Sequence, residues 1–486
     1  MAESLKSMSV KGMKWSGIDS IVTHVVAFVV GLVIARLLTP DDYGTVGMLS
    51  IFIAVSQIFV NSGFSISLVR MKNKTDDDYA TAFCFNATAG LLMYALLFLT
   101  APAIATFYRM PILENVLRVY AIALVINALQ IVPRTKLVVA VDFKTQAMVN
   151  LVAALVSGGI GITMAYAGYG LWALVWQSIV RSMVSMTLLW IVTGWKPWKG
   201  HPTKSSFDSL FSFGSKLMVS GLLHTVYNNI SKLVIGKFYT PADLGLYSRG
   251  QSLAELPSMQ ITSILQRVSY PVLARLQDDE QQLTAAYRRY LCLSSMVIFF
   301  LIALLVATAN PLVVLLLTEK WIGAVPFLRI FCLALVFDHI CQINNNMLYV
   351  KGRSDLFFKL EIAKKVIVFP LLLLAIPYGV IAICFIPVVH TLVDLLLGTY
   401  YIGRLMSVSV LTQVKDYGIY LPLSLLACVP AFLLCQTDLT YWLSLTAAVI
   451  ISSLLYLWML RHDANMMELV RMVRFKQTQL ALIKKN

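Results

Sequence analysis

Runs of about twenty apolar residues follow one another along the whole of this 486-residue chain. A helix needs about 20 mostly apolar residues to cross the hydrocarbon core of a bilayer. Only 13% of the residues are charged, whereas soluble domains average about 25%. The sequence therefore predicts an all-α polytopic membrane protein, with no stretch long enough for a separate soluble domain.

The loops between the apolar runs alternate in charge. One set is rich in Lys and Arg, and the other holds only Arg109, Lys237 and Lys320. The positive-inside rule places the basic loops and both termini in the cytoplasm. This bias accounts for the net charge of +15, so nucleic acid is not an expected partner. The fourteen candidate spans lie at about 15–38, 44–69, 79–107, 112–133, 145–167, 170–194, 207–236, 244–274, 288–317, 324–350, 356–376, 379–403, 416–435 and 441–460.

A charged turn occurs twice, as "TPDDYG" at 39–44 and as "TPADLG" at 240–245. Pro and Gly favour a tight reversal, and Asp42 or Asp243 can cap the helix that follows. Two more pairs of segments are alike, namely "LRVYAIALV" with "LRIFCLALV" and "AGYGLWA" with "IPYGVIA". The repeat predicts two six-helix lobes, related by a pseudo-two-fold axis along the membrane normal, with a cavity between them.

The repeat also sets the predicted domains. An N-terminal six-helix lobe covers 1–204 and a C-terminal six-helix lobe covers 205–410. A terminal helix pair follows at 411–460. The last segment, 461–486, is expected to be a basic amphipathic helix on the cytoplasmic surface, with a frayed polar tail as the alternative.

The seventh span carries a ridge of polar residues spaced by four, Lys216, Ser220, His224, Asn228 and Lys232. Residues at this spacing lie on one side of a helix. A Lys at the middle of a helix facing lipid costs about 2.5–3.5 kcal/mol, so the ridge is expected to face protein or water. The second span repeats the spacing with Gln57, Asn61 and Ser65.

The candidate cavity residues include more cations than acids, which favours an anionic cargo in a confined space of low dielectric constant. Amides and hydroxyls between the cations suit a sugar. The candidate substrate-binding residues are Arg36, Lys216, His224, Asn228, Lys232, Arg249, Arg181 and Arg267. The candidates for ion coupling are Asp19, His24 and Glu255.

Structural roles are the alternative for several of these groups. Glu255 can form an ion pair inside the helix bundle, with Arg249 or Lys232 as its partner. His24 and His224 can serve helix packing. Lys364 and Lys365 are expected to extend toward the cytoplasmic membrane surface, and Asp394 is expected to have a structural role near His390.

The sequence gives little support to enzyme chemistry. It contains no serine-nucleophile motif, no phosphate-cradling glycine loop and no cluster with the spacing of metal ligands. We therefore expect neither a catalytic residue nor a metal or other cofactor.

Several segments carry a resemblance to a known family. They are "ARLLTPDDYG", "SLVRMKNKTDDDYATAF", "APAIATFY", "LGLYSRGQSLAELP", "VSYPVLARLQDDEQQLTAAYRRYL" and "EKWIGAVPFLRIFCLA". Over about residues 10–405 the chain resembles the Wzx-type polysaccharide flippases of the multidrug/oligosaccharidyl-lipid/polysaccharide exporter superfamily. The similarity is to the branch of lipopolysaccharide-biosynthesis and colanic-acid-type exporters.

The resemblance implies two lobes in a V shape, alternating access and a bacterial inner-membrane location. The implied cargo is an undecaprenyl-diphosphate-linked oligosaccharide, moved from the inner to the outer leaflet for lipopolysaccharide, capsule or exopolysaccharide assembly. A polysaccharide polymerase is a candidate partner. Two alternatives stay open at this point. A cation-coupled multidrug exporter of the same superfamily would show an acid-rich binding lobe, and a membrane glycosyltransferase or polymerase would need a large catalytic loop.

The charge pattern predicts the topology directly. Positions 199 and 288 should lie in the cytoplasm and position 320 outside. Single cysteines at these positions in a cysteine-free background, probed on intact cells with an impermeant maleimide, measure this. Labelling at 320 alone is expected, and labelling at 199 but not at 320 would overturn the topology.

Overall fold

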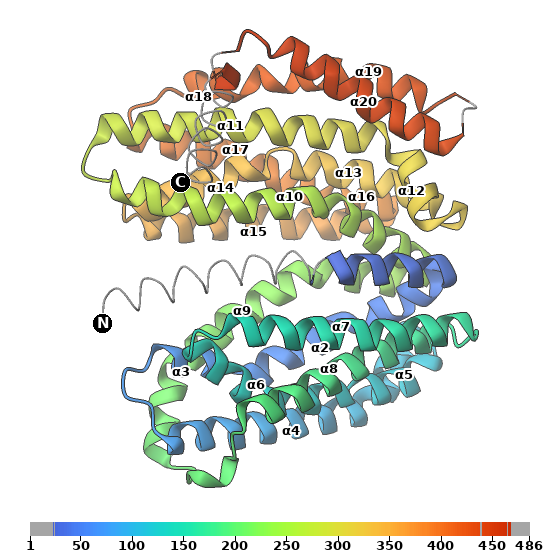
Figure 1. The fold of residues 1–486 in the computed structure, drawn as a ribbon, viewed down its shortest axis with the longest axis vertical. Coiled ribbons are helices and arrows are strands. Elements are labelled where there is room, and N and C mark those ends of the chain that lie inside the picture. The colour runs from blue at the N-terminus through green and yellow to red at the C-terminus, as the bar shows by residue number, and fades with distance from the viewer. Residues whose placement is uncertain (1–22, 24, 438–439, 464, 468–486) are drawn as a thin grey trace, which may run out of the picture. The chain divides into compact units, whose positions relative to one another are not determined.

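The computed structural model describes residues 23, 25–437, 440–463 and 465–467, and every regular element in them is a helix (Figure 1). This confirms the all-α fold class. The first helices are Val25–Leu37, α2 (Pro40–Asn61), α3 (Phe64–Arg70), α4 (Asp76–Tyr108), α5 (Ile112–Tyr120), α6 (Ile122–Val139), α7 (Phe143–Tyr166), α8 (Leu171–Thr193) and α9 (Lys204–Phe238).

The chain continues through helices of varied length. These are α10 (Pro241–Arg275), α11 (Glu280–Ala307), α12 (Ala309–Leu317), α13 (Val325–Leu335), α14 (Asp338–Val350), α15 (Ser354–Ala375), α16 (Val380–Cys384), α17 (Ile386–Leu405), α18 (Val410–Gly418), α19 (Tyr420–Leu434) and α20 (Tyr441–Met459). Short 3-10 turns lie at Pro197–Lys199, Glu319–Ala324 and Ile376–Tyr378.

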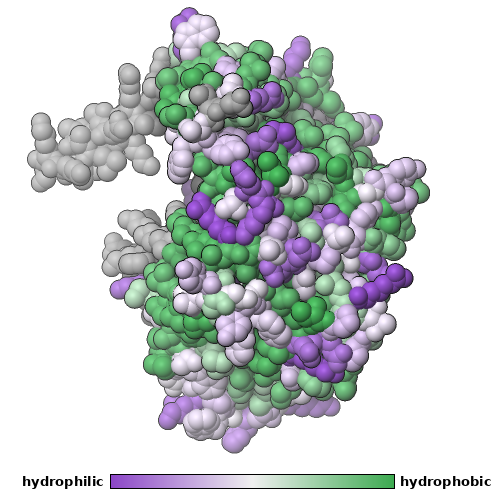
Figure 2. Space-filling view, turned by 90° about the vertical axis from the view of Figure 1, so that its right-hand side faces the viewer, coloured by the Kyte–Doolittle hydropathy of each residue, from purple (hydrophilic) through white to green (hydrophobic). Residues whose placement is uncertain are grey.

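Within the described residues, ten helical segments are long and apolar enough to cross a membrane. Each of the fourteen predicted runs overlaps a helix, but α9, α10 and α15 are more polar, and the helix Val25–Leu37 is shorter. The count of fourteen crossings therefore stays a prediction. Figure 2 shows hydrophobic residues over much of the face in view, as expected for a surface that contacts lipid. Leu99, Leu396 and Leu454 are among the exposed apolar side chains.

The repeated turn starts a helix in the same way at both places. The Thr39 hydroxyl accepts from the Asp42 amide (3.3 Å), and the Asp42 carboxylate accepts from the Thr39 amide (2.9 Å). Thr240 and Asp243 make the same pair of bonds, at 3.2 Å and 3.1 Å. These reciprocal bonds satisfy amides that the first turn of a helix leaves unpaired. Asp42 therefore takes part in a capping box, as the third residue of the helix, with Thr39 at the N-cap, and Thr240 and Asp243 repeat these bonds.

The two turns also pack against each other through their glycines. A Cβ atom placed on Gly44 would lie 1.6 Å from the Pro241 carbonyl oxygen. A Cβ atom placed on Gly245 would lie 2.0 Å from the Pro40 carbonyl oxygen. Neither position has room for a side chain. The start of each helix therefore fits closely against the start of the other.

The chain divides into two compact units, residues 1–245 and 246–486. The first unit includes α9, because α9 packs against α2, α3 and α4. The expected six-helix division at 204/205 stays a prediction.

The two units share local features at repeated positions. In the first, Arg118 Nε donates to the Phe98 carbonyl (3.5 Å), and in the second, Arg329 Nε donates to the Val306 carbonyl (3.4 Å). Gly170 and Gly379 have positive φ values of 54° and 98°, and each immediately precedes a helix. The repeated segments found in the sequence therefore have matching local structure.

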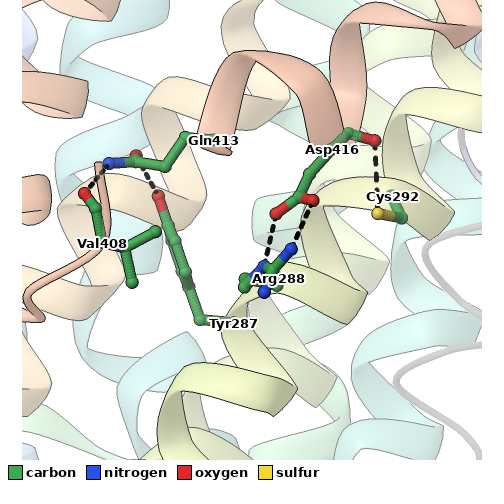
Figure 3. A network of polar contacts seen from close by, with 6 residues as sticks. All are labelled: Tyr287, Arg288, Cys292, Val408, Gln413 and Asp416. Atoms are coloured by element: carbon green, nitrogen blue, oxygen red, sulfur yellow. Dashed lines mark hydrogen bonds and ion pairs between the residues drawn. The ribbon is translucent and has the colours of Figure 1, made fainter. Parts of the chain in front are cut away.

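The helices at the end of the chain are tied to α11 by polar contacts (Figure 3). Arg288 donates to both carboxylate oxygens of Asp416 on α18, at 2.6 Å and 2.8 Å. The Tyr287 hydroxyl lies 2.9 Å from Gln413 Oε1 and 2.7 Å from Asn344 Oδ1. A bidentate arginine–carboxylate pair fixes orientation as well as distance. It therefore holds α18 against α11.

The glycine contact predicts a selective loss of stability. The Gly44→Ala variant should lose about 1–3 kcal/mol, because its new methyl group meets a backbone carbonyl and forces the helix starts apart. Gly159→Ala on α7 is the matched control, since nothing lies within 4 Å of its added Cβ. The control should melt at or slightly above the wild-type temperature, because Ala favours a helix more than Gly does. Thermal unfolding in detergent compares the two, and equal melting temperatures would contradict the close contact.

Candidate functional site

A polar cavity of about 400 Å³ lies between α2, α3 and α6 in the first unit. Its lining consists of Gln57, Asn61, Gly63, Ser65, Ile66, Asn127, Gln130, Ile131 and Arg134. Its volume is within the range of small-molecule pockets, about 300–1,000 Å³. Four of the nine lining residues carry side-chain amides, although both α2 and α6 belong to candidate membrane spans.

Hydrogen bonds join the amides into a chain that ends at an arginine. Gln57 Nε2 donates to Asn61 Oδ1 (3.5 Å), and Asn127 Nδ2 donates to Gln57 Oε1 (3.3 Å). Gln130 Nε2 donates in turn to Asn127 Oδ1. Arg134 Nη2 then donates to Gln130 Oε1 (3.5 Å). Gln130 is buried and the other three amides are half-buried, and each of the four is paired, which avoids the cost of an unsatisfied polar group in an apolar surrounding.

Arg134 sets the direction of this chain. A guanidinium only donates hydrogen bonds, so Gln130 must turn its oxygen toward Arg134. The Gln130 amide nitrogen then faces Asn127, and the same constraint passes along the chain to Gln57. Arg134 is itself held by a bond from Nη2 to Ser185 Oγ on α8 (3.0 Å). The polar wall of the cavity is therefore oriented before any ligand arrives.

The end of helix α2 at Asn61, followed by a bend in the chain, opens the cavity at this point. The helix α2 ends at Asn61, and Ser62 and Gly63 follow with φ values of 45° and 71°. A Cβ atom on Gly63 would lie 2.6 Å from the Gly214 carbonyl oxygen of α9. The left-handed bend and the close approach of α9 both require a residue without a side chain at this point. The bend turns the chain aside and leaves the hollow next to Asn61.

The sequence pointed to only part of this site. The spacing of Gln57, Asn61 and Ser65 was noted, but Asn127, Gln130 and Arg134 were missed as a group. In the sequence, Arg134 looks like one of the many cations of the predicted cytoplasmic loops. Its place in the cavity is therefore not evident from the sequence. The spacing of 127, 130 and 134 by three and four residues is the signal that could have found this face of α6.

The predicted ridge on α9 lies on the side of the helix away from its packed face. Lys216, Ser220, His224 and Asn228 are exposed and Lys232 is half-buried, whereas Gly214 is buried. Asn228 Nδ2 lies 3.2 Å from a ring nitrogen of His224. The ridge residues do not line the cavity between α2 and α6. Their role in binding stays a prediction.

The other predicted site residues belong to several helices of the two units. Arg36 and Arg181 are exposed. Arg249 is half-buried, and its guanidinium carbon lies 5.8 Å from the centre of the Trp321 ring. Glu255 Oε1 accepts a bond from Gln251 Nε2 (2.8 Å). Asp19, His24 and the side chain of Arg267 fall outside the described part, as does the tail from residue 468 onward.

A second group of charges lies inside the other unit and corrects one prediction. Lys364 does not extend to the membrane surface, because its side chain is only 2% exposed and its Nζ lies 3.0 Å from Asp394 Oδ1 on α17. It also pairs with the carboxylate of Glu361. Lys365 is 39% exposed and lies 3.6 Å from Glu361. The packing of α15 on α17 buries Lys364, which the sequence of α15 alone does not reveal.

Comparison with known proteins identifies a family and several similar proteins that are named for polysaccharide biosynthesis. The profile of the family described as "Polysaccharide biosynthesis protein" matches residues 33–326. The teichuronic acid biosynthesis protein TuaB of Bacillus subtilis is 23% identical over 359 residues, covering 73% of this chain and 74% of that protein. The lipopolysaccharide biosynthesis protein WzxC of Escherichia coli is 23% identical over 372 residues, covering 76% and 75%. The succinoglycan biosynthesis transport protein ExoT of Rhizobium meliloti is 24% identical over 329 residues, covering 67% and 65%.

Two solved structures share the fold. An inward closed conformation of the lipid II flippase MurJ matches with a TM-score of 0.73 and 13% identity, covering 91% of this chain and 97% of that one. An inward-facing multidrug transporter of the MATE family and MOP superfamily matches with a TM-score of 0.58 and 15% identity, covering 80% and 99%. At these identities the likeness concerns the fold.

The buried lysine provides a further prediction. Lys364→Met should cost about 3–5 kcal/mol, because it leaves Asp394 and Glu361 without the ammonium group between them. The neighbouring Lys365→Met is the matched control and should cost no more than about 1 kcal/mol, since its partner contact is open to solvent. Melting temperatures in detergent measure both changes. A similar shift in melting temperature in the two variants would show that the buried ion pair contributes no more to stability than the exposed one.

Proposed function

Because this chain belongs to the polysaccharide biosynthesis protein family, we propose that it is a flippase for undecaprenyl-diphosphate-linked oligosaccharides. The family match includes both copies of the repeated turn. The similar proteins are named for teichuronic acid, lipopolysaccharide and succinoglycan biosynthesis, which are all polysaccharide pathways. The chain moves the lipid-linked unit from the inner to the outer leaflet of the bacterial inner membrane, with both its termini in the cytoplasm.

The amide-lined cavity is the observation that supports this function best. Sugar hydroxyls both donate and accept hydrogen bonds, and side-chain amides offer both kinds of partner. A lipophilic drug would leave these amides without replacements for the hydrogen bonds that it displaced. The cavity therefore favours a hydroxyl-rich cargo over the drug of a multidrug exporter. No residue that lines the described cavity is acidic, which also argues against a cationic drug.

The diphosphate is assigned to the cations predicted from the sequence. Arg36, Lys216, Lys232, Arg181, Arg249 and Arg267 supply charges suited to phosphate oxygens, and His224 with Asn228 adds polar contacts. By alternating access, these cations face each side of the membrane in turn. Asp19, His24 and Glu255 are the candidates for coupling this cycle to an ion. A polysaccharide polymerase then receives the unit at the outer leaflet.

Complementation in cells tests the function. A strain without its own flippase accumulates lipid-linked units at the inner leaflet, and expression of this chain should restore surface polysaccharide. If the wild-type chain restores nothing and instead confers drug resistance, the multidrug alternative holds.

The proposed diphosphate residues are tested in the same strain. Each lost charge-assisted contact costs about 1.5–3 kcal/mol, or roughly ten- to a hundredfold in affinity. The Lys232→Ala, Arg249→Ala double variant should therefore fail to restore polysaccharide at normal expression. Lys72→Ala, at an exposed position between α3 and α4, is the control and should behave as wild type. Full restoration by the double variant would remove these two residues from the site.

A further inference from the structure

We propose that the cavity between α2 and α6 binds an acidic sugar of the cargo, with Arg134 contacting its carboxylate. This inference rests on the proposed function and adds to it the chemical class of one sugar. It also makes Arg134 a specificity-determining residue, a role that the sequence did not suggest.

The first argument is the charge of the lining. Arg134 is the only ionisable residue among those that line this cavity in the described part of the chain. The other polar lining groups are neutral amides and a hydroxyl. A cation at one end of a row of neutral hydrogen-bonding groups matches a ligand with hydroxyls along one edge and a single anionic group. A hexuronic acid has this arrangement.

The second argument concerns the order of the hydrogen bonds. Because Arg134 donates to Gln130, the amide chain runs in one direction as far as Asn61. Its last member, Asn61, accepts the bond from Gln57 and directs its own amide nitrogen onward. The wall therefore presents a graded set of groups, from a full cation to neutral donors and acceptors, along one row. Such a row would select a sugar by its charge and would also hold it in one orientation.

The third argument separates the acidic sugar from the diphosphate of the lipid carrier. A diphosphate diester carries two negative charges, and a buried site for it needs more than one cation. The cavity offers one. The guanidinium of Arg134 is held in place by bonds from Nη2 to Ser185 and Gln130, and its single positive charge matches a single carboxylate. The carboxylate is therefore the better match.

The experiment measures binding to the full-length protein in detergent. The probes are two polyprenyl-diphosphate-linked disaccharides that differ only in the terminal sugar, glucuronic acid in one and glucose in the other. The wild-type protein should bind the glucuronate probe about ten- to a hundredfold more tightly. Arg134→Gln should abolish this difference by weakening the glucuronate probe alone.

Each other outcome has a separate meaning. Equal binding of both probes by the wild type would overturn the acidic-sugar site and leave the flippase function intact. Equal weakening of both probes by Arg134→Gln would show that Arg134 acts on a feature both probes share, either through the diphosphate or through the amide wall, which also overturns the proposal. Binding of neither probe by the wild type would overturn the proposed function and this inference together.

A second variant guards against a folding defect in Arg134→Gln. Asn127→Asp places a carboxylate in the cavity and keeps the arginine. It should weaken the glucuronate probe about tenfold more than the glucose probe, because only the glucuronate carboxylate is repelled. An Asn127→Asp variant that keeps the wild-type preference would contradict the assignment. Arg134→Lys retains the charge and should keep a reduced preference for glucuronate.

Discussion

The cost of an unpaired polar group in hydrocarbon controls where this chain places its amides and charges. In the first unit, the amides of α2 and α6 pair with one another and with Arg134. In the second unit, Lys364 pairs with Glu361 and Asp394. The first arrangement leaves a cavity and the second is packed. The same constraint thus produces a site suited to a ligand in one unit and an internal ion pair in the other.

The two copies of the repeated turn contact each other. Each copy begins a helix with a capping box, and each glycine accepts the backbone of the other copy. A residue with a side chain at either glycine would separate the two helix starts. The local similarity of Arg118 with Arg329, and of Gly170 with Gly379, shows that other parts of the repeat kept their roles.

Much of the fold could be predicted from the sequence, because apolar runs, capping residues and turn glycines act locally. The caps at Asp42 and Asp243 are examples. The burial of Lys364 could not, since it depends on how α17 covers α15. The cavity was partly visible in the spacing of Gln57 and Asn61. Its remaining wall comes from α6, and its arginine resembles an ordinary cytoplasmic charge until the two helices are brought together.

The central claim is that this chain carries a lipid-linked oligosaccharide across the membrane, and transport by the purified protein tests it most directly. Proteoliposomes would carry undecaprenyl-diphosphate-linked oligosaccharide in both leaflets, and an impermeant glycosidase added outside would remove sugar from the outer leaflet. We predict that cleavage continues beyond the outer-leaflet fraction only when the protein is present. Cleavage that stops at the same fraction as in protein-free liposomes would contradict the account.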